Sequence, residues 1–156
     1  MKTNSNPSTT IRIVSVHDVD PVGILAFDLR QILEALEESV RGYSWVAEWF
    51  DSTGECISTG IVLSFDQLIH HARRVGQTID CTIFGCPSDD LTAADLESIT
   101  EILDFPKTKA RVVILAVDGC YFELIAKDMP IIDQIRQAFR DVRDRDTSGY
   151  FTLESS

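Results

Sequence analysis

The sequence predicts an α+β domain in which helices pack on one face of a mostly antiparallel sheet. Segments that alternate between apolar and polar residues, as strands do, are interspersed with segments whose apolar residues recur every three or four positions, as in helices. Several expected strands follow one another across short polar turns, which is typical of antiparallel neighbours. The 156 residues, 44% of them hydrophobic, are enough for one domain core but few for two.

The first strand and the first helix follow a polar N-terminal tail. We expect residues 1–9 to be disordered, whereas residues 10–16 alternate and are rich in β-branched side chains. Asp20 and Pro21 suit the N-cap and the first position of a helix, because a proline there gives up no hydrogen bond. We therefore expect a helix over residues 21–41. Its apolar stripe consists of Leu25, Leu29, Ile32, Leu36 and Val40.

An aromatic strand and its hairpin partner come next. Residues 43–50 alternate, and we expect one set of their side chains to share a face. That set is Tyr43, Trp45, Ala47 and Trp49. Residues 51–54, Asp-Ser-Thr-Gly, form the expected turn, and a return strand lies within residues 55–63.

A capping box predicts where the second helix begins. Ser64 can accept a hydrogen bond from the backbone of Gln67, whose side chain reaches back to Ser64. The helix is expected to end at Gly76. A strand over residues 77–84 and a short helix over residues 92–103 follow.

Residues 111–127 give the clearest local prediction, a β-hairpin centred on Asp118 and Gly119. Asp-Gly favours a two-residue type I′ turn, in which both residues take a positive φ. With that turn, Glu123 lies on the face opposite the apolar pairs. The expected facing pairs are Val117 with Cys120, Leu115 with Phe122, and Val113 with Leu124.

The last helix is expected to begin at Asp128, with Pro130 in its first turn. Its apolar residues are Ile131, Ile132, Ile135, Phe139 and Val142. We expect residues 10–146 to form a single domain and residues 147–156 a loose tail. The order of the first six elements, β-α-β-β-α-β, resembles a ferredoxin-like arrangement, to which the hairpin and the last helix are added.

The chain is strongly acidic, with a formal net charge of −11. Nucleic acids and anionic membranes would repel such a domain, so we expect neither as a direct partner. The sequence contains no run of the roughly 20 apolar residues that span a membrane, and its first residues lack the apolar core of a signal peptide. We therefore expect a cytoplasmic protein with reduced cysteines, of which Cys81 and Cys120 belong to the core.

No sequence motif for phosphate binding, for a nucleophilic serine or for zinc-dependent hydrolysis is present. We expect no metal and no cofactor, because His70 and His71 would diverge on a helix and the four cysteines lack ligand spacing. If a pocket between sheet and helices binds a small molecule, we expect its polar groups to be His17, Asp18, His70 and Cys86.

The chemical feature that stands out is a window without basic residues between Arg74 and Lys107. Its carboxylates give the domain an acidic side, which is either a solvated surface or a docking face for a basic protein. The acidic residues of this window are Asp80, Asp89, Asp90, Asp95, Glu97, Glu101 and Asp104.

Three functions are compatible with these features. The one we favour is a non-catalytic acidic interaction protein, such as an immunity-type inhibitor, whose carboxylates occlude a basic cleft of its partner. Its aromatic contact residues would come from Tyr43, Trp45, Trp49 and Tyr121. The second is a small-molecule-binding protein or enzyme that uses the pocket above. The third is a homo-oligomer in which another copy covers the sheet face formed by Val112, Ile114, Tyr121 and Ile125.

Overall fold

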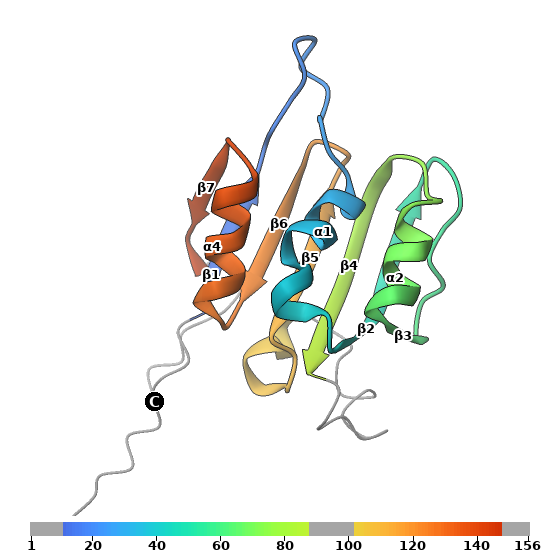
Figure 1. The fold of residues 1–156 in the computed structure, drawn as a ribbon, viewed down its shortest axis with the longest axis vertical. Helices are drawn as coiled ribbons and strands as arrows, with labels where there is room; N and C mark the ends of the chain where they lie inside the picture. Colours follow the sequence, from blue (N-terminus) through green and yellow to red (C-terminus); the bar gives the residue numbers. More distant parts are fainter. Residues whose placement is uncertain (1–10, 88–101, 148–156) are drawn as a thin grey trace, which may run out of the picture.

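The computed structural model describes residues 11–87 and 102–147, which form an antiparallel sheet of seven strands with helices on one face (Figure 1). The strand order is β3-β2-β4-β5-β6-β1-β7. In chain order the elements are β1 (Arg12–Val16), α1 (Leu29–Val40), β2 (Tyr43–Ser52), β3 (Val62–Ser64), α2 (Phe65–Ala72), β4 (Thr78–Pro87), the 3-10 helix η2 (Ile102–Lys107), β5 (Val112–Val117), β6 (Tyr121–Ala126), α4 (Met129–Ala138) and β7 (Val142–Arg145). The predicted α+β class, with helices packed against a mostly antiparallel sheet, is confirmed.

The strand pairing departs from a ferredoxin-like arrangement. β1 pairs with β6 on one side and with β7 on the other, and it contacts neither β2 nor β4 as a neighbour. The first six elements therefore do not make a sheet of their own, and that part of the prediction is wrong. Element order is a local property, whereas the position of β1 depends on β6, which lies more than a hundred residues later in the chain.

Alternation divides the apolar residues of the sheet between two faces. Val112, Ile114 and Ala116 of β5 belong to the main core beneath the helices. Val113 and Leu115 belong to a separate apolar cluster on the other face, which we call the second face. The residues proposed for an oligomer contact therefore do not share one face. Helices of the same chain already cover Val112 and Ile114, whereas Ile125 lies on the second face.

The first helix begins at Leu29, later than predicted, because Asp28 rather than Asp20 forms its capping box. The Gln31 side chain accepts the N–H of Asp28 at 2.9 Å and completes the box. Asp20 closes a tight turn instead, where its Oδ1 accepts two backbone N–H groups within residues 20–24 at 2.9 and 3.0 Å. The segment between β1 and α1 consequently projects beyond the sheet (Figure 1).

A bulge in β2 separates Trp49 from the aromatic residues predicted to share its face. The pairing of β2 with β4 shifts between Ala47 and Trp49, so Glu48 adds one residue to the strand. Trp45 is buried beneath the helices, and Phe50 takes the next core position. Trp49 lies on the second face, where it is 58% exposed. The prediction of one shared face is therefore wrong for Trp49.

The turn between β5 and β6 forms as predicted, but the register beyond it does not. Asp118 and Gly119 have φ angles of 55° and 65°, and the N–H of Cys120 donates to the carbonyl of Val117 at 2.9 Å. The ladder nevertheless pairs Val117 with Tyr121 and leaves Cys120 out. The three predicted facing pairs are therefore wrong by one residue.

This shift changes which side chains are buried. Glu123 pairs with Leu115 on the second face and is only 5% exposed. Cys120 is exposed rather than part of the core. Cys81 is buried as predicted, and burial raises the pKa of its thiol to about 12.

The last helix is shorter than predicted, and Val142 begins an edge strand instead of completing the helix. The carboxylate of Asp18 accepts the N–H groups of Arg140 and Asp141, the latter at 2.6 Å. This contact between residues far apart in the sequence turns the chain after α4, so that β7 can pair with β1.

The predicted starts of α2 and α4 are confirmed. Ser64 and Gln67 form the predicted capping box of α2, and Pro130 lies in the first turn of α4. Asp128 is the N-cap residue of α4, but its carboxylate forms an ion pair with Arg111 instead of binding a helix N–H. Within the described ranges, no helix is both long and apolar enough to cross a membrane.

Candidate functional site

The second face is divided into two halves of different character. We name as the closed half an apolar cluster whose sheet members, each at most 9% exposed, are Ile13, Val46, Phe84, Cys86, Val113, Leu115 and Ile125. We name as the open half the residues that continue this face toward the turn at 118–119, namely Ser15, His17, Trp49, Asp51, Asp80, Tyr121 and Glu123. Polar and aromatic side chains replace the aliphatic ones within one or two residues along each strand.

The β2–β4 end of the open half carries negative charge beside an exposed indole. Asp51 lies directly opposite Asp80 in the ladder, and Trp49 shares the face two residues from Asp51. Asp80 accepts the N–H of Asp118 at 3.0 Å. Neither Asp51 nor Asp80 forms an ion pair with a basic side chain in the described part of the chain. Like charges at facing positions are unfavourable in a sheet, so the pairing of Asp51 with Asp80 costs free energy.

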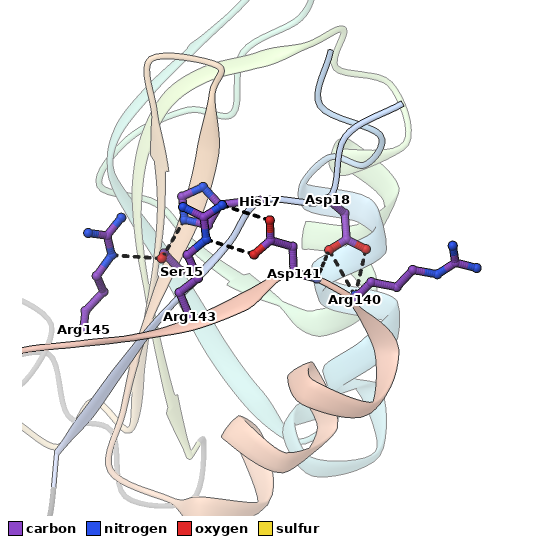
Figure 2. A network of polar contacts seen from close by, with 7 residues as sticks. All are labelled: Ser15, His17, Asp18, Arg140, Asp141, Arg143 and Arg145. Carbon is purple, nitrogen blue, oxygen red and sulfur yellow. Dashed lines mark hydrogen bonds and ion pairs between the residues drawn. The ribbon is translucent and has the colours of Figure 1, made fainter. Parts of the chain in front are cut away.

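The β1–β7 end of the open half carries a network of polar contacts (Figure 2). Nε2 of His17 lies 2.7 Å from Oγ of Ser15, and Nε of Arg145 donates to the same oxygen at 2.9 Å. The His17 ring stacks on Tyr121 with the centroids 4.8 Å apart, and the Arg145 guanidinium lies 5.7 Å from the Tyr121 centroid. One buried hydroxyl and one aromatic ring thus fix the positions of His17 and Arg145.

The neighbouring contacts hold β7 in place. Nε and Nη2 of Arg143 donate to the two carboxylate oxygens of Asp141 at 2.9 and 3.0 Å. The backbone N–H of His17 donates to the carbonyl of Asp141 at 2.8 Å. The backbone bond of His17 and the contacts of Asp18 with the start of this segment (Figure 2) join the end of β1 to the edge strand.

The environment of His17 favours its neutral form. Burial lowers the pKa of His17 below its usual 6.5, and the positive charges of Arg143 and Arg145 act in the same direction. The carboxylates of Asp141 and Glu123 oppose this shift without reversing it. A neutral His17 can accept the Ser15 hydroxyl hydrogen at Nε2, since Arg145 donates to the oxygen of that hydroxyl.

The contact between Ser15 and His17 has the length of a nucleophile–base pair, but its surroundings do not suit catalysis. Ser15 is fully buried, so a substrate cannot reach its hydroxyl. The carboxylate of Asp141, which could orient a catalytic histidine, is bound on both oxygens by Arg143. The network therefore positions an imidazole and a guanidinium at the surface rather than activating the serine.

A second polar cluster lies at the opposite end of the sheet. A hollow of ≈ 430 Å³ there is lined in part by Thr108 and Arg111. Lys127 donates from Nζ to the Thr108 carbonyl at 2.6 Å and lies 4.6 Å from the centroid of Phe105. Burial, followed by the charge of Arg111, lowers the pKa of Lys127 to about 8. Because Arg111 is paired with Asp128, both cations serve contacts within the fold.

The structure does not bring the four residues of the expected small-molecule pocket together. His17 follows β1, whereas Cys86 is buried on β4, three strand spacings or roughly 14 Å away across the sheet. His70 is exposed on α2, and Asp18 is engaged with the backbone after α4. Within residues 11–87 and 102–147, no three His, Cys, Asp or Glu side chains form a group that could hold a metal ion.

Of the acidic window, the structure describes the side chain of Asp80 alone. The other members, Asp89, Asp90, Asp95, Glu97, Glu101 and Asp104, have side chains outside the described residues, as does the expected helix over residues 92–103. Sequence reasoning missed Asp51, Ser15 and Arg145 as members of a site. The bulge at Glu48 and the strand β7, which bring them onto one face, have no local signature that we could have used.

A comparison of the chain with protein-family models, with curated proteins and with solved structures found no match.

Proposed function

We propose that this protein is a non-catalytic interaction protein that binds a basic protein partner through Trp49, Asp51 and Asp80. The observation that carries the proposal is the exposed indole of Trp49 beside two facing carboxylates that no basic side chain of the described residues neutralises. An indole face and carboxylates together suit a guanidinium or ammonium group, through cation–π and charge-assisted contacts.

The free-energy costs of exposing Trp49 and of placing Asp51 opposite Asp80 favour a binding surface over a merely solvated one. A tryptophan side chain that is 58% exposed leaves much apolar area in water, and the facing carboxylates repel each other. A cation between them relieves both costs. The net charge of −11 adds long-range attraction, which raises the rate of encounter with a basic protein.

The finer form of the proposal is an immunity-type inhibitor that occludes a basic cleft. Trp49 would enter the cleft as the main contact, because tryptophan, tyrosine and arginine dominate interface energetics. Tyr121 lies on the same open half and would extend the contact. The remaining acids of the window would add negative charge to the protein and so to its long-range attraction for a basic partner.

The test uses an oligo-arginine peptide as a probe and the tryptophan fluorescence of the intact protein as the readout. Trp45 is 1% exposed and Trp49 58% exposed, so Trp49 dominates any change on binding. We expect Asp51→Asn with Asp80→Asn to weaken binding by about tenfold. The asparagine at position 80 can still accept the Asp118 N–H, which keeps the local fold.

The matched control removes the same charge elsewhere. Glu38 and Asp133 are exposed on α1 and α4, on the helical side of the sheet. Glu38→Gln with Asp133→Asn should weaken binding only through net charge, by a much smaller factor that disappears in moderate salt. Equal losses in both double variants would show that only net charge matters and would refute the proposed site.

A further inference from the structure

The segment between β1 and α1 folds back on itself and projects beyond the sheet (Figure 1). We name residues 18–26 the arm. Two backbone bonds join its limbs: the N–H of Asp20 donates to the carbonyl of Ile24 at 2.7 Å, and the N–H of Ala26 donates to the carbonyl of Asp18 at 2.9 Å. These bonds fix the shape of the arm before any partner binds, which lowers the entropy cost of binding.

The pairing within the arm leaves one edge of its second limb free. Val19 and Leu25 face each other between the two bonds, so the N–H and C=O of Leu25 point away from Val19. No described residue forms a hydrogen bond with either group. An edge with free N–H and C=O groups is a template for pairing with another extended segment.

A hollow of ≈ 390 Å³ lies along the second limb. It is lined by residues 24–28 and by Gln31, Gln77 and Thr78, whereas Val19 of the first limb does not line it. The first limb continues from β1, and the far wall of the hollow belongs to the start of β4, which lies beyond the second limb (Figure 1). The hollow is therefore on the free side of the second limb.

The wall of the hollow contains a hydroxyl that the fold does not use. Thr78 is fully buried, and its Oγ1 has no hydrogen-bond partner among the described residues. Its backbone N–H, by contrast, donates to Oδ2 of Asp28 at 2.9 Å. Because buried hydroxyl groups in native proteins are nearly always paired, this one is evidence for a polar ligand beside it.

The lining of the hollow suits an uncharged ligand. Asp28 is the one titratable side chain among its described lining residues, and both carboxylate oxygens accept backbone N–H groups, at 2.7 and 2.9 Å. Gln31 and Gln77 supply neutral amides, and Ile24, which is 59% exposed, supplies apolar surface. A peptide group, which is neutral and has one donor and one acceptor, matches these features.

We propose that the arm and this hollow bind an extended, uncharged segment of a partner protein, one residue of which pairs with Leu25 as in an antiparallel sheet. In such a pair each residue donates its N–H to the carbonyl of the other, so one residue of the segment satisfies both free groups of Leu25. An apolar side chain of the segment covers Ile24. The site lies beside α1 and not on the second face, so it does not depend on the proposed function.

The experiment titrates the intact protein with the blocked tripeptide N-acetyl-Val-Thr-Val-amide while NMR follows the backbone amides. We expect a saturable downfield shift of the Leu25 N–H and a slowing of its hydrogen exchange by about tenfold at saturation. Exchange of the Ala26 N–H, which Asp18 already binds, should not change. A peptide methylated at its central amide nitrogen cannot donate to Leu25 and should bind about fivefold more weakly.

Two matched substitutions in the arm test the role of the hollow. Ile24→Thr removes apolar surface from the hollow, whereas Val22→Thr makes a similar change at a residue that is 82% exposed and does not line it. Both variants keep the backbone N–H groups that Asp20 binds. Ile24→Thr should weaken binding of the tripeptide by about fivefold, and Val22→Thr should leave it unchanged.

Thr78→Val tests the unpaired hydroxyl at nearly constant side-chain volume. The variant should bind the tripeptide about threefold to tenfold more weakly, while its urea midpoint stays at or above that of the wild type, because the fold makes no hydrogen bond to Oγ1. A lower midpoint together with unchanged binding would show that the hydroxyl serves the fold and would contradict its role in the site.

Two other results would overturn the proposal. Equal binding of the methylated and unmethylated peptides, or equal losses in the Ile24→Thr and Val22→Thr variants, would show a nonspecific apolar contact instead of strand pairing. A shift of the Leu25 N–H that depends on protein concentration in the absence of peptide would show that a second copy of the chain occupies the free edge.

Discussion

The two halves of the second face are made from the same strands, yet they differ in what they bury. In the closed half, aliphatic and aromatic side chains such as Phe84 and Ile125 are fully buried. In the open half, Trp49 is 58% exposed and Asp51 faces Asp80. The change occurs within a few residues of each strand, and the bulge at Glu48 contributes to it by bringing Trp49 onto this face.

This difference separates stability from binding on a single surface. The closed half contributes apolar burial, which is the main favourable term in folding. The open half contains features that a folding requirement would not select, since facing carboxylates and an exposed indole both cost free energy. Substitutions in the closed half should therefore change the unfolding free energy, and substitutions at Trp49, Asp51 and Asp80 should change binding.

The largest expected effect tests this separation directly. Phe84→Ala removes a fully buried ring from the closed half and should lower the unfolding free energy by about 3–5 kcal/mol. Trp49→Ala removes a larger ring from the open half and should lower it by less than about 1 kcal/mol. Urea unfolding of both variants provides the measurement. Comparable losses would mean that Trp49 is part of the stabilising core, contrary to the proposed function.

A smaller loss of unfolding free energy is expected from a substitution at Gly85, which packs closely against Trp45 and Val112 on the helix-covered face. A Cβ added at Gly85 would lie 2.6 Å from the Trp45 ring and 2.8 Å from a methyl group of Val112. Gly85→Ala should therefore cost about 1–3 kcal/mol through overpacking. Near-UV circular dichroism should also change, because the Trp45 ring must move. An unchanged stability would indicate that the indole can move away without loss.

A substitution in the turn at Asp118 and Gly119, which borders the open half, should lower the unfolding free energy by a smaller amount. Gly119 has φ +65°, and the left-handed conformation costs a β-branched residue about 1–2 kcal/mol. Gly119→Val should lower the unfolding free energy by that amount. Gly42→Ala is the matched control, because a Cβ there meets no atom within 4 Å and its φ is not positive. Equal effects of the two substitutions would contradict the assigned turn.

Local sequence signals predicted the parts of this fold that local interactions determine. The capping box of Ser64 and Gln67 and the positive φ angles of Asp118 and Gly119 depend on a few neighbouring residues, and both predictions are confirmed. The start of α1 was mispredicted because Asp20 and Asp28 are both good caps, and Asp28 has the additional support of Gln31.

The open half could not be predicted in the same way, because tertiary contacts assemble it. Trp49 reaches the second face through the bulge at Glu48, and Arg145 through β7, which forms after Asp18 turns the chain. The omission of Cys120 from the ladder moves Glu123 to the second face. The periodicity of the sequence does not predict the bulge, the edge strand or the omitted residue, yet together these features decide which side chains lie side by side.

The smallest expected effect concerns His17 at the β1–β7 end of the open half. Burial and the charges of Arg143 and Arg145 hold the pKa of His17 below the 6.5 of an unfolded chain. Between the two pKa values the unfolded state binds more protons, so the contribution of His17 to stability is lost as the pH falls below about 6.5. The wild-type protein should therefore lose more of its unfolding free energy between pH 7.5 and 5.5 than the His17→Gln variant does. Urea midpoints at the two pH values, measured in a buffer without phosphate, give the comparison, and an equal loss in both proteins would mean that His17 titrates alike in the folded and unfolded states.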